Sequence, residues 1–369
     1  MCSFNRIVLT VAAAMFALGA LDYLLGNRWG FGKKFNEGFH TFTPLLLTMA
    51  GFIILSPVAA RVIAPAVSPL FGCIGADPAL LPGIILACDN GAYPLAQSLS
   101  PTPEGAKFGG LLLGSVLGAN VISIPIALQL LSKPDQKLYF QGLIFGVITI
   151  PFGLLAGGLT AGFPLLFILR QLPPLIVLSI LMTAVLLRYP KVLIRILAGF
   201  AKTMEVLSIA GLTVAVCTEL SGFPLPGLVP VEEALKIVGG IVIILPGAYV
   251  FIEVVTRLFR RILPAAAKKL KINESAVVGF LTTSANAIPT LALLDKMDPR
   301  GKLLNCAFLS SGAYALGDHL AFCGTVAPDM LLPLVVTKLI AGIAAVIAAL
   351  AYLRKVGNPC PDPSPDKAS

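Results

Sequence analysis

Hydrophobic stretches of about twenty residues follow one another along almost the whole chain and are separated by short polar links. A helix needs roughly 20 apolar residues to cross a bilayer. The pattern therefore predicts an all-α polytopic membrane protein with about 11 transmembrane helices. The predicted spans are 5–25, 39–60, 78–99, 108–131, 138–161, 163–188, 203–221, 235–257, 275–295, 303–326 and 330–353.

Three segments do not fit this pattern of spans. Val62–Ala76 is too short and too rich in proline to cross a bilayer, so we expect a re-entrant or interfacial piece. Pro190–Phe200 carries basic residues at helical spacing, which favours a position in the membrane interface. Residues 356–369 are rich in proline and polar side chains and are expected to form a disordered tail, after one integral-membrane domain over residues 1–355.

Composition and charge place the chain in the membrane and argue against a nucleic-acid partner. Hydrophobic residues make up 57% and charged residues 12%, against about 25% charged residues in soluble proteins. The formal charge is +9, and basic residues fall between hydrophobic segments, as in the links 188–202 and 257–271. The positive-inside rule puts these links in the cytoplasm, so the lipid bilayer is the expected partner. The seven cysteines show no metal-ligand spacing, and no metal site is predicted.

Two carboxylates stand inside otherwise apolar segments. Asp89 lies in ALLPGIILACDNGAYPLAQSL and Asp318 in CAFLSSGAYALGDHLAFCGTV. A bare aspartate at mid-membrane costs at least roughly 2.5–3.5 kcal/mol, so each needs a partner or a role. His319 follows Asp318 directly, which favours a proton-coupled or pH-gated role; a purely packing role remains the alternative. The acids Asp22, Glu205, Glu219 and Glu253 are expected near helix ends, within reach of the interface.

The two halves of the chain resemble each other, with predicted repeats over about 39–162 and 234–353. GFIILSP in the first half corresponds to GIVIILP in the second, and the interruption ACDNGAYP corresponds to TTSANAIP. Helix interruptions at matching places in two halves are typical of a transporter's binding site. Proline kinks that serve packing are the alternative. The pattern leaves open whether the repeats are parallel or inverted.

Polar side chains at these interruptions form the predicted substrate site. Two carboxylates would attract a small cation, amides would hydrogen-bond a polar group, and tyrosine rings would face a positive charge. The predicted substrate-binding residues are Asp89, Asn90, Tyr93, Asn120, Asn286, Tyr314, Asp318 and His319. No Walker A loop, GxSxG elbow, HExxH or acidic calcium loop occurs, so we predict neither an enzyme nor a cofactor. An enzyme acting on lipid headgroup amines is a weaker alternative.

Several strings resemble one known family of membrane proteins. LACDNGAYPLA, ANAIP, KMDPRGKLLNCAF, ALGDHLAF, NEGF, VITIPFGLLAGGL and VVTKLIAGI are similar to the bacterial ethanolamine transporters of ethanolamine-utilisation operons, the EutH family. The resemblance runs from the first helix to about Lys355. It implies a protein of the bacterial cytoplasmic (inner) membrane that admits ethanolamine for catabolism. Asn90 departs from the apolar residue expected at its position, which bears on substrate preference.

Alternatives remain at the level of the sequence. The residues are also compatible with a proton- or sodium-coupled carrier of another small amine or polar solute. Uniport and coupled transport, the side of the C-terminus and assembly into a homo-oligomer all stay open.

Overall fold

The computed structural model describes residues 2–223, 225–259 and 263–357. Within these ranges eight helices are long and apolar enough to cross a membrane, which confirms the prediction of an all-α polytopic membrane protein. The predicted tail 356–369 lies almost entirely outside the described residues. The elements are α1 (Cys2–Leu24), α2 (Phe31–His40), α3 (Phe42–Leu45), η1 (Leu46–Ala50), α4 (Gly51–Cys73), α5 (Leu80–Ile85), η2 (Cys88–Ala92), α6 (Tyr93–Leu99), α7 (Pro103–Ala106), η3 (Lys107–Gly118), α8 (Ala119–Leu130), α9 (Lys133–Thr160), α10 (Leu165–Arg188), α11 (Pro190–Ser221), α12 (Val231–Phe259), α13 (Leu263–Leu270), α14 (Glu274–Ala285), α15 (Ala287–Leu293), η4 (Leu294–Lys296), α16 (Pro299–Gly312), α17 (Asp318–Val326), η5 (Pro328–Met330) and α18 (Leu331–Val356).

Three predicted spans are each divided into shorter helices. Span 78–99 becomes α5, η2 and α6, and span 275–295 becomes α14, α15 and η4. Both divisions fall at the interruptions that the sequence indicated. Span 303–326 was predicted as one helix, and this prediction was wrong: residues 313–317 are unwound between α16 and α17. Asp318 therefore begins a helix instead of lying late in one.

Two predicted interfacial segments are parts of long helices. Val62–Ala76 was predicted to be re-entrant, but α4 continues through Pro65 and Pro69 to Cys73. Proline is tolerated inside membrane helices where neighbouring groups satisfy the freed carbonyls. Pro190–Phe200 was predicted to lie apart from the next span, but it forms the first turns of α11. The proline at the start of α11 removes no helical hydrogen bond, so nothing separates the basic turn from the apolar part.

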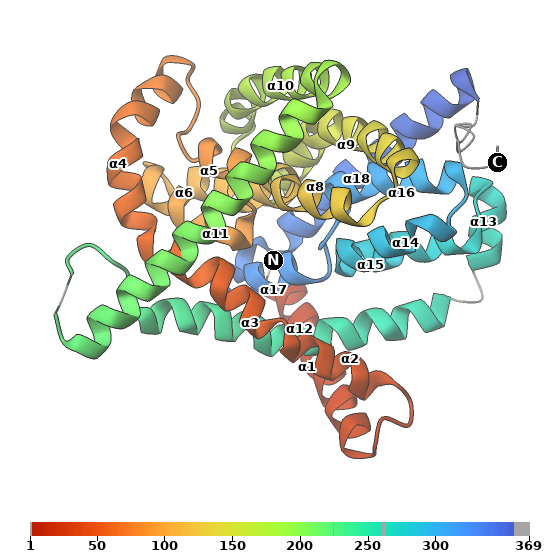
Figure 1. The fold of residues 1–369 in the computed structure, drawn as a ribbon, viewed down its shortest axis with the longest axis horizontal. Helices are drawn as coiled ribbons and strands as arrows, with labels where there is room; N and C mark the ends of the chain where they lie inside the picture. The colour runs from red at the N-terminus through yellow and green to blue at the C-terminus, as the bar shows by residue number, and fades with distance from the viewer. Residues whose placement is uncertain (1, 224, 260–262, 358–369) are drawn as a thin grey trace, which may run out of the picture.

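An antiparallel pair of helices, α9 and α18, lies at the centre of the fold (Figure 1). The Thr149 hydroxyl donates to the Ala341 carbonyl at 3.0 Å, and Gly153 and Gly157 lie against Thr337. Numbers rise along α9 as they fall along α18, which establishes the antiparallel direction. Small residues allow the close approach. Helix α16 packs against both helices, and the unwound residues 313–317 follow directly after it.

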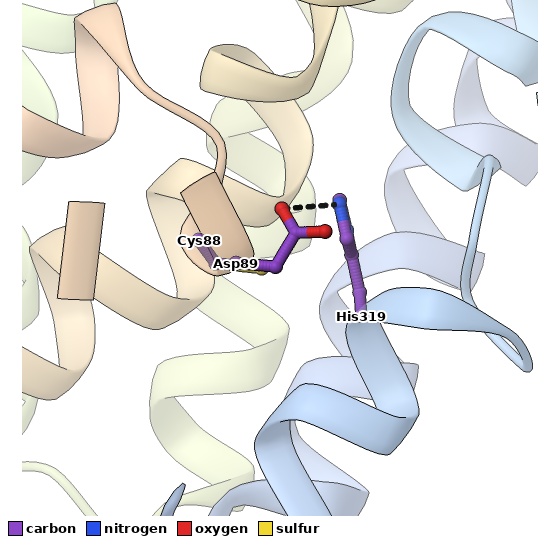
Figure 2. A group of neighbouring side chains, drawn as sticks. All are labelled: Cys88, Asp89 and His319. Atoms are coloured by element: carbon purple, nitrogen blue, oxygen red, sulfur yellow. Dashed lines mark ion pairs between the residues drawn. The ribbon is translucent and has the colours of Figure 1, made fainter. Parts of the chain in front are cut away.

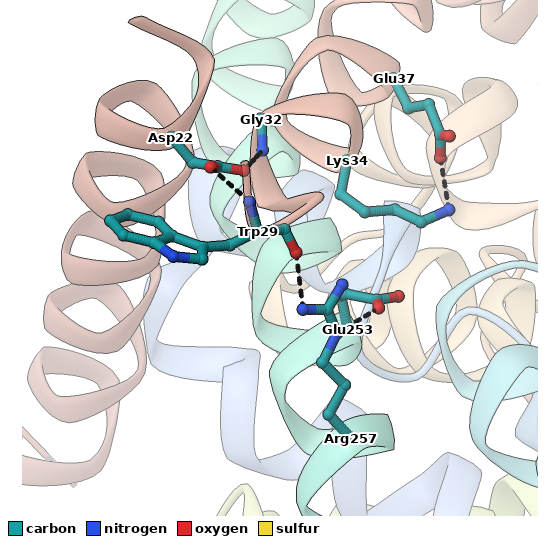
Figure 3. A network of polar contacts seen from close by, with 7 residues as sticks. All are labelled: Asp22, Trp29, Gly32, Lys34, Glu37, Glu253 and Arg257. Atoms are coloured by element: carbon teal, nitrogen blue, oxygen red, sulfur yellow. Dashed lines mark hydrogen bonds and ion pairs between the residues drawn. The ribbon is translucent and has the colours of Figure 1, made fainter. Parts of the chain in front are cut away.

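Helices α1, α2 and α12 pack against one another around one buried carboxylate. Asp22 is 0% exposed, and its two oxygens accept hydrogen bonds from the backbone N–H groups of Trp29 and Gly32, both at 2.8 Å (Figure 3). Arg257 of α12 donates to the Trp29 carbonyl at 2.6 Å and pairs with Glu253 at 2.7 Å. Asp22 lies near the end of α1, as predicted, but its carboxylate is buried and bonded to backbone groups. It satisfies the start of α2, where backbone N–H groups have no helical partner.

Replacement of Asp22 by alanine is expected to destabilise the protein by about 1.5–3 kcal/mol, because two backbone donors lose a charged acceptor. The thermal unfolding midpoint in detergent measures this loss. Glu219→Gln, at an exposed position near the end of α11, is the matched control and should leave the midpoint unchanged. Equal midpoints for Asp22→Ala and the wild type would show that the hydrogen bonds of Asp22 do not stabilise the protein.

Candidate functional site

At two helix breaks, a glycine from another segment packs against a backbone carbonyl at the point where the helix ends. Leu86 and Ala87 leave the helical conformation ahead of η2, and Asn286 does so between α14 and α15. A Cβ atom on Gly118 would collide with the Leu86 carbonyl oxygen, and one on Gly317 would collide with that of Ala285. Gly118, at the end of η3, and Gly317, just before α17, therefore make the same kind of contact. In both, a glycine lets another segment approach an interrupted helix.

The two broken segments of the second half satisfy each other's backbone. In the unwound residues 313–317, the Tyr314 N–H donates to the Thr283 carbonyl at 3.0 Å, and the Leu316 N–H donates to the Ser284 carbonyl at 2.7 Å. Irregular backbone at membrane depth is tolerated only where such partners or a water-filled cavity exist. These bonds fix the start of α17 beside the end of α14. They set the position of Asp318 and His319.

A chain of polar contacts connects Asp89, His319 and Lys338. Asp89 extends from η2 toward His319 of α17, with 3.5 Å between its Oδ1 and Nε2 of the imidazole (Figure 2). The other ring nitrogen, Nδ1, lies 3.1 Å from the ammonium of Lys338 in α18, which also donates to the Ser115 carbonyl at 2.5 Å. Their exposed fractions are 7%, 2% and 0% in that order. We call these three residues the buried triad.

Lys338 was missed by the sequence analysis. The prediction assigned the basic residues to cytoplasmic links and found only acids and a histidine deep in the membrane. The signal was nevertheless present, since Lys338 is the single charged residue in the run 331–353. An intramembrane lysine of this kind is a functional candidate by default. Its presence means that Asp89 is not a bare carboxylate.

Cys88, Asp89 and His319 place a thiol, a carboxylate and an imidazole within 4.8 Å of one another (Figure 2). This donor set has the chemistry of a zinc ligand group. The Lys338 ammonium, however, lies against the imidazole and interacts electrostatically with Cys88 and Asp89. A fixed positive charge opposes a divalent cation at the same place. The donors are close enough for a metal, but the charge beside them fits one poorly.

Asp318 lies in a different environment from Asp89. It is the first residue of α17, and its side chain is only partly buried. The Tyr249 hydroxyl from α12 lies 3.4 Å from the Asp318 Oδ1. Tyr249 and Asn286 both line a cavity of about 490 Å³ between α2, α12, α14 and α15. Asp318 is thus a partly buried carboxylate that contacts a hydroxyl group on the wall of this cavity.

A second cavity lies beside the first interruption. Asn90 lines this space of about 400 Å³ together with residues of η1, α8 and α11. Its side-chain amide donates to Asp89 Oδ1 at 3.3 Å. Asn90 therefore stands between the buried triad and the second cavity. Gly91, at φ 102°, provides the backbone turn that places Asn90 there, in a conformation that side chains with a Cβ rarely adopt.

Three other predicted site residues make contacts within the protein. Tyr93 packs edge-on against Phe322, with 6.4 Å between ring centroids. The Asn120 amide donates to the Ser310 carbonyl at 2.9 Å and to carbonyls of its own helix, so it joins two segments. Tyr314, at φ 62°, places its ring 5.0 Å from the His319 ring. Asp89, Asn90, Asn286, Asp318 and His319 remain beside the cavities or the buried triad.

Broken helices, intramembrane charges and cavities beside the breaks define a polytopic membrane transport protein. The chain belongs to the EutH family, described as ethanolamine utilisation protein EutH, which it matches over residues 4–352. The prediction of a multi-pass bacterial inner-membrane transport protein, and not an enzyme, is confirmed.

Curated relatives cover nearly the whole chain. It is 39% identical over 350 residues to a protein of Listeria monocytogenes named "Probable ethanolamine permease EutH", with 94% of each chain covered. It is 35% identical over 391 residues to the Escherichia coli protein of the same name, covering 95% of this chain and 96% of the relative. The Bacillus subtilis protein YxeR is 38% identical over 347 residues, with 94% of each chain covered. The search of solved structures found no significant match.

Replacement of Gly317 by valine is expected to destabilise the protein by about 1–3 kcal/mol or more, because the new side chain would push α17 away from the Ala285 carbonyl. Thermal unfolding in detergent measures the effect. Gly239→Val is the matched control, since its Cβ would meet no atom within 4 Å. A Gly317→Val protein as stable as the control would show that the close approach does not matter.

Proposed function

We propose that this protein is a secondary transporter or facilitator that moves protonated ethanolamine across the bacterial cytoplasmic membrane, with Asp318 as the carboxylate that receives the ammonium group. The observation that carries the proposal is the partly buried Asp318 carboxylate, 3.4 Å from the hydroxyl group of a tyrosine that lines a cavity of about 490 Å³. The names of the relatives support the substrate.

The chemistry of the site suits a small hydroxylated ammonium ion. A primary amine with a lysine-like pKa of about 10 is charged at neutral pH and needs a negative partner in a low-dielectric site. Asp318 supplies the negative charge. Tyr249 and Asn286, which interact with each other, can bind the hydroxyl group as donor or acceptor. The cavity is also lined by Lys34 and Glu37, which pair with each other, and by Glu253, which pairs with Arg257, so these charges are already compensated within the protein.

The two carboxylates take different roles in this proposal. Asp89 is compensated within the protein by Lys338 through His319, whereas Asp318 has only neutral hydrogen-bond partners among the described contacts. A substrate cation is therefore attracted to Asp318. The antiparallel α9 and α18, together with the matching contacts of Gly118 and Gly317, support inverted repeats around the site.

A carrier of another small amine is the second candidate function, favoured by one observation. The cavity of about 490 Å³ is far larger than ethanolamine needs. Competition of labelled ethanolamine uptake by unlabelled choline, propanolamine and ethylamine, each in excess, separates the two candidates. Competition by ethylamine equal to that by ethanolamine itself would show that the hydroxyl group is not recognised.

The Asp318→Asn variant is expected to lose ethanolamine affinity by about fivefold to tenfold, because a charge-assisted hydrogen bond worth about 1.5–3 kcal/mol becomes a neutral one worth about 0.5–1.5 kcal/mol. Uptake of labelled ethanolamine by proteoliposomes at mildly acidic pH measures the loss. Asp295→Asn, an exposed acid in η4, is the control and should transport normally. Normal affinity in Asp318→Asn would place the substrate elsewhere.

The Tyr249→Phe variant is expected to weaken ethanolamine binding by about threefold to tenfold, since a net hydrogen bond of about 0.5–1.5 kcal/mol is lost. The concentration dependence of uptake gives this change. Tyr352→Phe, on α18 against Phe145, removes a hydroxyl that lies elsewhere and should have no effect. Equal affinities of the two variants would exclude Tyr249 from the site.

A further inference from the structure

The buried triad places its groups in the order that a proton relay requires. The Lys338 ammonium is a donor only, so the His319 Nδ1 that it contacts at 3.1 Å must accept. A neutral imidazole with an accepting Nδ1 carries its proton on Nε2, the atom that faces the Asp89 carboxylate at 3.5 Å. The geometry thus fixes the tautomer of His319 and the direction of proton transfer, from Lys338 through His319 to Asp89.

The surroundings of the triad give each end a different neighbour. At one end, the Lys338 ammonium is held by the Ser115 carbonyl of the π-helical segment η3, deep in the core. At the other end, Asp89 accepts from Asn90, which lines the cavity of about 400 Å³. The titratable groups that face the triad from the packed segments are Cys88, Tyr314 and Asp318. Only the Asp89 end therefore leads toward a space that water can enter.

The triad also lies next to the proposed substrate carboxylate. Asp318 and His319 are consecutive, and Asp318 interacts electrostatically with Asp89. An ammonium ion bound at Asp318 would bring a second positive charge close to the Lys338 ammonium. Like charges in a low-dielectric site repel strongly, so arrival of the substrate favours departure of a proton from the triad.

We propose that Lys338, His319 and Asp89 form a proton-exchange site that releases one proton for each ethanolamine cation that binds at Asp318. This inference rests on the function proposed above. Lys338 Nζ gives a proton to His319 Nδ1 while the proton of His319 Nε2 passes to Asp89 Oδ1. The imidazole changes tautomer and all three groups become neutral. Asp89 then gives its proton to water in the cavity beside Asn90, and the triad is left with a charge of −1 that balances the substrate.

Sodium has no role in this exchange. The Lys338 ammonium lies on the other side of the imidazole from Asp89 and compensates the carboxylate electrostatically, so no coupling ion is needed to neutralise it. Lysine suits this task because it can give up its proton in a buried site, whereas arginine cannot.

Proton release on substrate binding tests the proposal. Ethanolamine is added to purified protein in weakly buffered detergent at about pH 6.5, where the substrate is fully protonated and any released proton comes from the protein. A pH-sensitive dye records protons, and thermal stabilisation records binding. Wild type should release about one proton per bound ethanolamine.

Two variants of Lys338 test its role in this release. Lys338→Arg keeps the charge, and Lys338→Met removes it; both should release no proton. Lys302→Met, which removes a comparable lysine–aspartate pair with Asp135 elsewhere, should behave as wild type.

Binding without proton release in wild type would overturn the proton-exchange site, and so would unchanged release in both Lys338 variants. Lys338→Arg guards against misfolding of Lys338→Met, because it preserves the compensation of Asp89. Absence of ethanolamine binding in wild type would instead reject the proposed function.

A substrate-free measurement tests the buried triad even if the wild type does not bind ethanolamine. Infrared difference spectra between two pH values should show a carboxyl band in wild type that is missing in Asp89→Asn. In Lys338→Met this band should appear at a pH that differs by about one unit or more, because a charge beside the carboxylate is gone. An unchanged pH response would show that Asp89 and Lys338 do not share a proton equilibrium.

Discussion

The need to satisfy every buried polar group at membrane depth governs this structure. Water is absent from the bilayer core, so the backbone groups freed at a helix break must find partners within the protein. Here Tyr314 and Leu316 donate to the end of α14, and glycines at 118 and 317 admit the carbonyls of neighbouring breaks. The same requirement applies to charge. Asp89 has His319 and Lys338, whereas Asp318 has a tyrosine hydroxyl and partial access to solvent. In the proposed function, this unequal compensation leaves Asp318 as the acid that receives a cation.

Much of the architecture was predictable from hydrophobicity alone. Helix lengths and the breaks at 87–94 and 282–289 follow from apolar runs interrupted by small and polar residues, because an apolar run of about 20 residues satisfies its backbone groups in lipid by forming a helix. The unwound residues 313–317 were not predictable in this way. Glycine and alanine there are equally typical of close helix packing, and only tertiary contacts with Thr283 and Ser284 favour the unwound form. The burial of Asp22 was not predictable for a similar reason, since its backbone partners lie in the loop after α1 and in the first turn of α2.

The candidate site was predicted in its residue types and only partly in its organisation. Asp89, Asp318 and His319 were found because acids in apolar runs are costly. That cost alone does not reveal which acid is already compensated. The answer lay in Lys338, about 250 residues from Asp89 in sequence and in contact with the same histidine. Asn120 and Tyr93 illustrate the converse, because an amide or phenol in a membrane helix serves packing as readily as binding. Of the two remaining amides, Asn90 donates to Asp89, and Asn286 interacts with Tyr249, whose hydroxyl group contacts Asp318.

The central claim is that the substrate ammonium meets Asp318 while Asp89 stays with Lys338. Solid-state nuclear magnetic resonance with ¹⁵N-ethanolamine and ¹³C-labelled aspartate tests it most directly, at ligand concentrations that saturate each protein. The account predicts an ammonium-to-carboxylate distance of about 3–4 Å that persists in Asp89→Asn and disappears in Asp318→Asn. A close contact that disappears in Asp89→Asn and persists in Asp318→Asn would contradict it.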